Sequence, residues 1–140
     1  MMRQKLILIM MLMLPISMNA QKKEFDWIPV MDAIIQVESK GNPKAHNPVG
    51  DCAGILQITK GLVRECNSIL ESQKSKKRYS YSDRYNATKS KEMFVLLQEH
   101  FNPEHNVEKA IRCWNRGFYG NWRGKSTKYY NKVMKYYKGG

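Results

Sequence analysis

Residues 27–39 read Trp-Ile-Pro-Val-Met-Asp-Ala-Ile-Ile-Gln-Val-Glu-Ser, and this stretch contains the clearest helical pattern of the chain. Its residues at helical spacing (i, i+4, i+7, i+8 and i+11) are Trp27, Met31, Ile34, Ile35 and Glu38. These positions share one face of an α-helix, and the sequence Ser-Lys-Gly-Asn-Pro at 39–43 is typical of a helix end. The stretch therefore predicts an amphipathic helix whose last turn carries a carboxylate on the apolar face.

Helical spacing of apolar residues returns in four later stretches. They contain Leu62, Val63, Cys66, Ile69 and Leu70; Met93, Phe94, Leu97 and Phe101; Val107, Ala110, Ile111 and Trp114; and Tyr129, Val133, Tyr136 and Tyr137. The segments 41–53, 72–86 and 117–125 are polar, basic or rich in glycine, so we expect loops there. No stretch alternates between apolar and polar residues as a strand does. The sequence predicts an all-α fold, or nearly so.

The composition limits the class of protein. The chain has 140 residues, 24 of them Lys or Arg and 12 Asp or Glu, which gives a formal net charge of +12 at pH 7. Its length fits one ordinary domain, and its hydrophobic content of 42% is too high for a disordered chain. The positive charge favours an acidic partner. Aromatic residues lie among Lys and Arg at 78–85 and 116–130, but no recognised nucleic-acid motif is present, so we predict no nucleic-acid partner.

Residues 1–20 have the features of a secretory signal peptide. A short basic start precedes an apolar run at 6–16, which is too short to span a bilayer, and small and polar residues lead to Ala20. We expect cleavage after Ala20, which leaves residues 21–140 as one exported domain with no stable membrane insertion. Because Met18 is large for its place before the cut, a retained membrane anchor is the alternative.

The chain has three cysteines, Cys52, Cys66 and Cys113. Because export permits disulfides, one pair can form, and Cys52 with Cys66 is a candidate if the second helix folds back. Three small buried residues are the alternative. No Cys or His has the spacing of metal ligands, so the sequence predicts neither a metal nor a cofactor.

Glu38 is the candidate catalytic residue. A carboxylate on the apolar face of a helix is partly desolvated, and the negative end of the helix dipole lies beside it. Both effects disfavour ionisation and raise the pKa, which is what a general acid needs near neutral pH. A rim glutamate that pairs with Lys40 or Lys44 is the alternative interpretation.

Four short motifs follow one another along the chain. They are Glu38-Ser39, Asn42-Pro43, Gly54-Ile-Leu-Gln-Ile58 and Cys113-Trp-Asn-Arg-Gly117. Their order resembles that of the soluble lytic transglycosylases and goose-type lysozymes, in which the pattern is Glu-Ser, an Asn-Pro loop, Gly-Leu-Met-Gln-Ile and Ala-Tyr-Asn-Ala-Gly. The resemblance covers residues 27–137. It implies a single lysozyme-like transglycosylase domain with a substrate cleft between helices.

The resemblance implies roles for individual residues at the acid. Glu38 is similar to the family's sole catalytic acid/base, and Ser39 is similar to the residue that steadies it. Tyr129 resembles the C-terminal tyrosine that reaches toward the acid, and Tyr130 is the alternative match.

The resemblance also implies substrate-binding residues. Gln57 and Asn115 resemble the side chains that line the sugar cleft, and Trp114 stands where the family usually has a tyrosine that can stack on a sugar. Plain packing is the alternative for each of the three. The sequence departs from the family pattern in the segment 49–53, which is slightly longer and includes Asp51, and in the long basic linker 72–86.

The function implied by the resemblance is cleavage of the β-1,4 bond between N-acetylmuramic acid and N-acetylglucosamine in the periplasm or cell envelope of a bacterium. In a lytic transglycosylase Glu38 acts alone and the product has a 1,6-anhydro ring. In a hydrolytic lysozyme a second carboxylate activates water, and Asp51 is the candidate. We favour the first route and expect Asp51 to order its loop by accepting bonds from backbone N–H groups.

Two further expectations concern partners. The partner in either route is the glycan strand of peptidoglycan, and an assembly partner in the cell envelope is a further candidate. A non-catalytic peptidoglycan-binding protein is the remaining alternative, although such a protein has no need of a buried acid.

Overall fold

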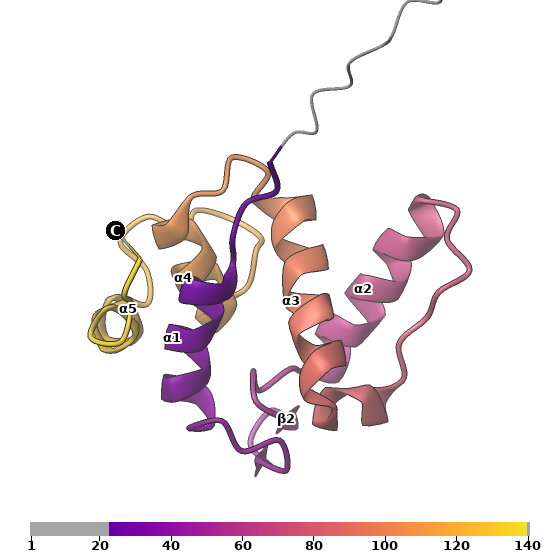
Figure 1. Ribbon diagram of the computed structural model, residues 1–140, viewed down its shortest axis with the longest axis horizontal. Helices are drawn as coiled ribbons and strands as arrows, with labels where there is room; N and C mark the ends of the chain where they lie inside the picture. The colour runs from indigo at the N-terminus through magenta and orange to yellow at the C-terminus, as the bar shows by residue number, and fades with distance from the viewer. Residues whose placement is uncertain (1–22, 140) are drawn as a thin grey trace, which may run out of the picture.

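The structure, a computed structural model, describes residues 23–139. Within this range the elements are α1 (Ile28–Glu38), β1 (His46–Asn47), β2 (Cys52–Ala53), α2 (Lys60–Ser72), the 3₁₀ helix η1 (Tyr81–Tyr85), α3 (Ala87–Phe101), α4 (Val107–Arg116) and α5 (Thr127–Met134). Figure 1 shows α1 and α3 at the centre, α2 on the outer side of α3, and α4 and α5 on the other side near α1. The hairpin β1–β2 lies below the C-terminal end of α1. The expected mainly helical fold is confirmed.

The apolar faces of the helices meet in one core. Its fully buried side chains include Ile34 from α1, Phe94 and Leu97 from α3, and Ile111 from α4. Each such side chain contributes about 1.5–3 kcal/mol by leaving water. The core therefore holds α1, and with it Glu38 at its last position, against α3 and α4.

The segment 41–53 differs from the expected strandless loop. His46 lies opposite Ala53 and Asn47 lies opposite Cys52 in a short antiparallel hairpin. Strands of two residues are too short to show alternation, so the sequence pattern does not reveal them. The hairpin matters because it places the Cys52 thiol near Glu38, the last residue of α1.

The basic segment 72–86 ends in the 3₁₀ helix η1, which the sequence pattern does not predict. Ser80 and Asp83 form a reciprocal capping box at its start, and the Asp83 carboxylate accepts the Ser80 backbone N–H at 2.8 Å. The backbone of η1 presses against Gly54, where an added Cβ would collide with the carbonyl of Arg84. Gly54 also has a φ of +82°, which favours glycine.

The three cysteines are free thiols. The pairing of Cys52 with Cys66 is therefore not formed, and burial raises the pKa of the Cys66 thiol to about 12. Among residues 23–139 no helix is both long and apolar enough to cross a membrane. The expected signal peptide, residues 1–20, lies outside the described residues.

Candidate active site

Glu38 is the last residue of α1, and its carboxyl group is half-buried. Burial raises the pKa of this carboxyl group because it removes the water that would stabilise the charged form. The hydroxyl of Tyr129, from α5, donates a hydrogen bond to Oε1 at 2.8 Å and offsets part of that rise. The acid therefore sits where α1 and α5 meet.

The alternative of a rim glutamate paired with lysine does not match the structure. Within residues 23–139 Glu38 makes no ion pair with Lys40 or Lys44. The pKa of Glu38 is shifted by burial and by Tyr129, with no contribution from a neighbouring charge. Tyr130, the alternative match for the tyrosine, places its ring under the guanidinium of Arg112, 4.4 Å away.

Ser39 connects the end of α1 to the segment that follows the hairpin. Its hydroxyl donates to the backbone carbonyl of Ile55 at 2.7 Å and accepts the backbone N–H of Gly41 at 3.1 Å. These two bonds fix the turn directly after Glu38. Ser39 thus holds the carboxyl group in place through the backbone, without touching it.

Gln57 and Trp114 both hold the segment 54–58. The amide nitrogen of Gln57 donates to the carbonyls of Gly54 at 3.0 Å and Ala45 at 3.3 Å. The indole of Trp114 donates to the carbonyl of Leu56 at 3.0 Å. Only 8% of Trp114 is exposed. The structure therefore places Trp114 behind this segment, in the core, and not at an open surface on which a sugar could stack.

Asn115 lies at the end of α4 and is exposed. Its Oδ1 accepts a hydrogen bond from the hydroxyl of Ser126 at 2.8 Å. Ser126 is the residue before α5, and its own side chain does not cap that helix. Asn115 thus links the end of α4 to the start of the helix that carries Tyr129.

Asp51 is surrounded by three basic side chains. Its carboxylate lies 2.7 Å from Nε2 of His46, 3.4 Å from Nζ of Lys60 and 3.7 Å from a guanidinium nitrogen of Arg84. The hydrogen bond with His46 is the main reason that the pKa of Asp51 is lowered. The expectation that Asp51 accepts backbone N–H groups is wrong, because side chains occupy its oxygens instead.

Arg84 supports the site from behind, and the sequence did not predict this role. It is only 4% exposed, and its guanidinium donates to the carbonyls of Asp51 at 2.7 Å and Ile58 at 3.2 Å. A third bond runs to the carbonyl of Tyr81 at 2.9 Å. Arg84 therefore ties the hairpin and the segment 54–58 to η1. No signal distinguishes it in a segment that is basic throughout.

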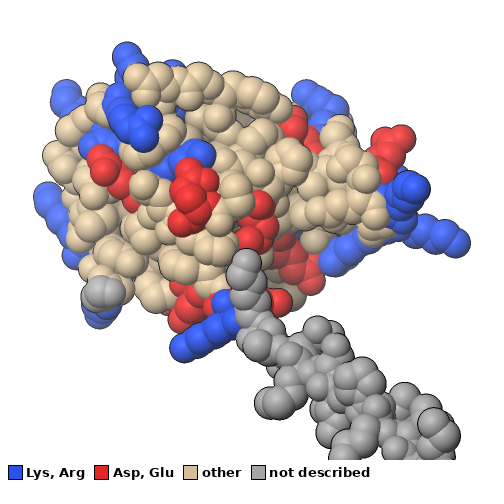
Figure 2. All heavy atoms as spheres, turned by 90° about the horizontal axis from the view of Figure 1, so that it is seen from above, with Lys and Arg blue, Asp and Glu red and all other residues tan. Residues whose placement is uncertain are grey.

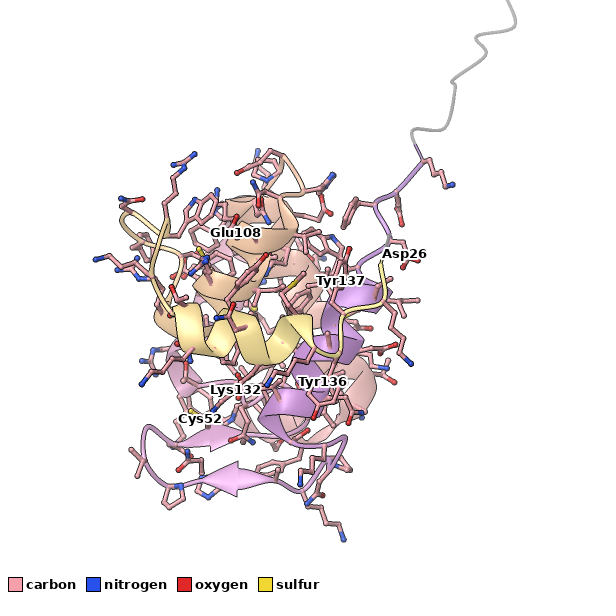
Figure 3. The ribbon with its side chains drawn as sticks, turned by 90° about the vertical axis from the view of Figure 1, so that its left-hand side faces the viewer. Asp26, Cys52, Glu108, Lys132, Tyr136 and Tyr137 are labelled. Carbon is pink, nitrogen blue, oxygen red and sulfur yellow. The ribbon has the colours of Figure 1, made fainter. Side chains whose placement is uncertain are left out.

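Cys52, expected as a disulfide partner or as a small buried residue, has its thiol near both acids. Burial and then the charges of Glu38 and Asp51 raise the pKa of this thiol. Figure 3 shows Cys52 on the hairpin, across from α5. Within the described part of the chain, no three His, Cys, Asp or Glu side chains are placed to hold a metal ion.

Charges of both signs occur on the face shown in Figure 2, in spite of the net charge of +12. On the face shown in Figure 2, Lys and Arg project around the edge, whereas acidic side chains gather nearer the middle. That face therefore offers no continuous basic surface to a polyanion.

Together these contacts hold a carboxyl group of raised pKa at the junction of α1, α5 and the hairpin. Such a group can protonate a leaving oxygen. The sequence model of one protein family, described as "Transglycosylase SLT domain", matches residues 15–137. No curated protein and no solved structure matches the chain.

Proposed function

The chain belongs to the transglycosylase SLT domain family, whose members are lytic transglycosylases that cleave glycosidic bonds in peptidoglycan, and we propose that Glu38 performs this cleavage here. The observation that carries the proposal is the half-buried Glu38 carboxyl group. Its pKa is raised by burial, and its Oε1 accepts the Tyr129 hydroxyl at 2.8 Å. A carboxyl group that keeps its proton toward neutral pH can act as the acid.

The bond that breaks joins C1 of N-acetylmuramic acid to the oxygen of the next N-acetylglucosamine. Glu38 gives its proton to that oxygen, which leaves with the bonding electrons as the 4-hydroxyl group. The acetamido oxygen of the substrate stabilises C1. The 6-hydroxyl of the same muramic acid then bonds to C1, and Glu38 takes its proton back. The product is a 1,6-anhydro end, and no water is consumed.

Tyr129 supports the half of this cycle in which Glu38 is charged. Its hydrogen bond favours the carboxylate and so lowers the energy of the state that follows proton donation. Burial and the charge of Glu38 raise the pKa of the Tyr129 hydroxyl, which therefore remains a donor throughout. Tyr129 thus stabilises the intermediate without giving up its own proton.

Hydrolysis would need a second carboxylate to activate water. Asp51 is the candidate, but its oxygens already contact His46, Lys60 and Arg84. These contacts lower the pKa of Asp51 and make it a weak base. This engagement supports the route in which Glu38 acts alone.

We assign supporting roles to four more residues. Ser39 positions the end of α1, and Trp114 holds the segment 54–58 from behind. Gln57 and Asn115 border the substrate. The polar atoms of these side chains that form no bond to the protein are available to bind sugar hydroxyl groups. We further propose that residues 1–20 direct export, so that the enzyme meets peptidoglycan in the cell envelope.

The test is mass spectrometry of purified peptidoglycan digested by residues 21–140. We expect anhydro-muropeptides from the parent enzyme and none from Glu38→Gln, which keeps the shape of the side chain but cannot donate a carboxyl proton. Asp51→Asn should still give anhydro products. Reducing-end products that vanish in Asp51→Asn would instead identify a hydrolase. Sacculi that are bound but uncut would identify a binding protein.

A further inference from the structure

Arg112 is a buried arginine in the middle of α4, a helix that packs against α5. Only 7% of this residue is exposed, and an arginine is rarely buried to this extent unless it is paired. Its Nε donates to Oε1 of Glu108, one turn earlier in the same helix, at 2.9 Å. That ion pair occupies Nε and leaves Nη1 for other partners.

The Nη1 atom of Arg112 binds the chain on both sides of the residue that precedes α5. It donates to the carbonyl of Lys125 at 2.6 Å and to Oγ1 of Thr127 at 3.0 Å. Ser126 lies between these two partners with a φ of +56°, and its side chain does not cap the helix. Arg112 therefore fixes the chain where α5 begins.

The guanidinium group also covers an aromatic ring in the first turn of α5. Its central carbon lies 4.4 Å from the centre of the Tyr130 ring, which is within the range of a cation–π contact. Tyr130 directly follows Tyr129, and successive residues of an α-helix point about 100° apart. A contact that fixes the direction of Tyr130 therefore also fixes the direction of Tyr129.

The bond from Tyr129 to the acid depends on the position of this turn. The hydroxyl donates to Oε1 of Glu38 at 2.8 Å, and a displacement of about 1 Å would break such a bond. Val133 is the only buried residue of α5, so the contacts at its first turn decide where Tyr129 points. The pKa of Glu38 is shifted by burial and by Tyr129, and the charge of Arg112 does not contribute.

We propose that Arg112 is a positioning residue for the cleavage reaction, because it holds the first turn of α5 where the Tyr129 hydroxyl reaches Glu38. The inference rests on the proposed function. Figure 3 shows α5 in front, with Glu108 of α4 above it and the hairpin below it. The ionisable groups that interact with Glu38 are Tyr129 of α5 and the Cys52 thiol of β2. Arg112 therefore acts on the acid through the placement of Tyr129.

The experiment is a double-mutant cycle between Arg112→Met and Tyr129→Phe. Methionine keeps an unbranched apolar stem and removes every donor of the guanidinium group. Alone, Arg112→Met should lower kcat about three- to tenfold, leave KM for peptidoglycan unchanged and move the alkaline limb of the kcat profile to higher pH. In the Tyr129→Phe background it should change neither kcat nor the limb. Equal losses of kcat in both backgrounds would overturn the proposal.

A milder variant keeps the test informative if Arg112→Met does not fold. Thr127→Val removes the hydroxyl that accepts from Arg112, together with its own bond of 3.4 Å to the carbonyl of Gly124. The matched control is Thr88→Val, which removes an exposed hydroxyl from the first turn of α3. The alkaline limb should move to higher pH in Thr127→Val and stay in place in the control. Equal profiles would contradict the proposal.

A titration without substrate tests the same contact independently of catalysis. The carboxyl carbon of Glu38 is followed by NMR as the pH is raised. The pKa of Glu38 should rise in Arg112→Met and in Tyr129→Phe, with no further rise when the two are combined. An unchanged pKa in Arg112→Met, or an equal rise in the Tyr129→Phe background, would overturn the proposal. If the parent cut no peptidoglycan, the proposed function would fail, while this titration would still test Arg112.

Discussion

The hydroxyl of Tyr129 lies 2.8 Å from Oε1 of Glu38, although the two residues are 91 positions apart in the sequence. The contact joins the last residue of α1 to α5 and makes the chemistry of the acid depend on a distant helix. Since burial raises the pKa of Glu38 and this bond lowers it, the two effects act against each other.

Tyr129→Phe should raise the pKa of Glu38, because only the lowering effect is removed. The acid must be protonated to act, so activity is lost as pH rises through this pKa. We expect the alkaline limb of the kcat profile to move to higher pH. The maximal kcat should fall about tenfold or more, because a hydrogen bond to a charged group is worth about 1.5–3 kcal/mol.

The control is Tyr130→Phe, which keeps the ring that packs against Arg112. Its kcat profile should match that of the parent. An alkaline limb that stays in place, or moves to lower pH, in Tyr129→Phe would show that the tyrosine does not tune the acid.

Glu38→Gln should make the free energy of unfolding less dependent on pH. The folded-state pKa of Glu38 lies above the ordinary value of 4.5, so between these two pH values the folded protein holds more protons than the unfolded chain. Stability of the parent from this group therefore falls as pH rises through that window. Urea unfolding at a series of pH values should show Glu38→Gln equal to the parent below pH 4.5 and more stable above the folded-state pKa. A Glu38→Gln variant that is less stable at neutral pH would contradict this.

Arg84→Lys should loosen the hairpin, because one ammonium group cannot reproduce three bonds to the carbonyls of Tyr81, Asp51 and Ile58. We expect a loss of about 2–4 kcal/mol in unfolding free energy. Faster hydrogen exchange should appear at Ala53 and Ile58, whose backbone groups pair with each other. Arg64→Lys, at an exposed arginine of α2, is the control. Equal hydrogen-exchange rates at Ala53 and Ile58 in the two variants would show that Arg84 does not hold the hairpin.

Gly54→Ala should be far more costly than Gly41→Ala. Both glycines have a positive φ, +82° and +81°, so both variants incur the conformational cost of about 1 kcal/mol. The added methyl group at Gly41 meets open space, whereas at Gly54 it collides with the backbone of Arg84. Thermal denaturation should show the difference as a further loss of about 2 kcal/mol or more for Gly54→Ala. Similar melting temperatures would mean that η1 does not press on this segment.

The five helices were predictable because each has a repeating apolar face of ordinary length. The short hairpin was not, since two-residue strands have no period. Arg84 could not be recognised either, because a buried arginine and a solvated one look the same in a basic segment. Trp114 illustrates the same limit for aromatic residues, because spacing does not tell a core ring from a sugar platform.

The contact between Tyr129 and Glu38 was predicted from the family resemblance and not from the helical periodicity. Helical pattern can place each residue on a face of its own helix, but it does not determine which helices meet. The side chains around Asp51 were likewise unpredictable, because they come from β1, α2 and η1. Contacts between elements that are far apart in sequence are what the structure adds.

The helix α5, which carries the proposed partner of Glu38, is short, and half of its residues are exposed. It is eight residues long, Val133 is its only buried residue, and no side chain caps its start, where the Ser126 hydroxyl bonds Asn115. Short segments with few buried groups detach at a lower free energy than the whole domain unfolds. Detachment would take Tyr129 from Glu38 while α1, α3 and α4 stay packed. On warming, activity should therefore be lost at a lower temperature than the one at which the domain unfolds. The cause would be local unfolding of the C-terminal end of the chain.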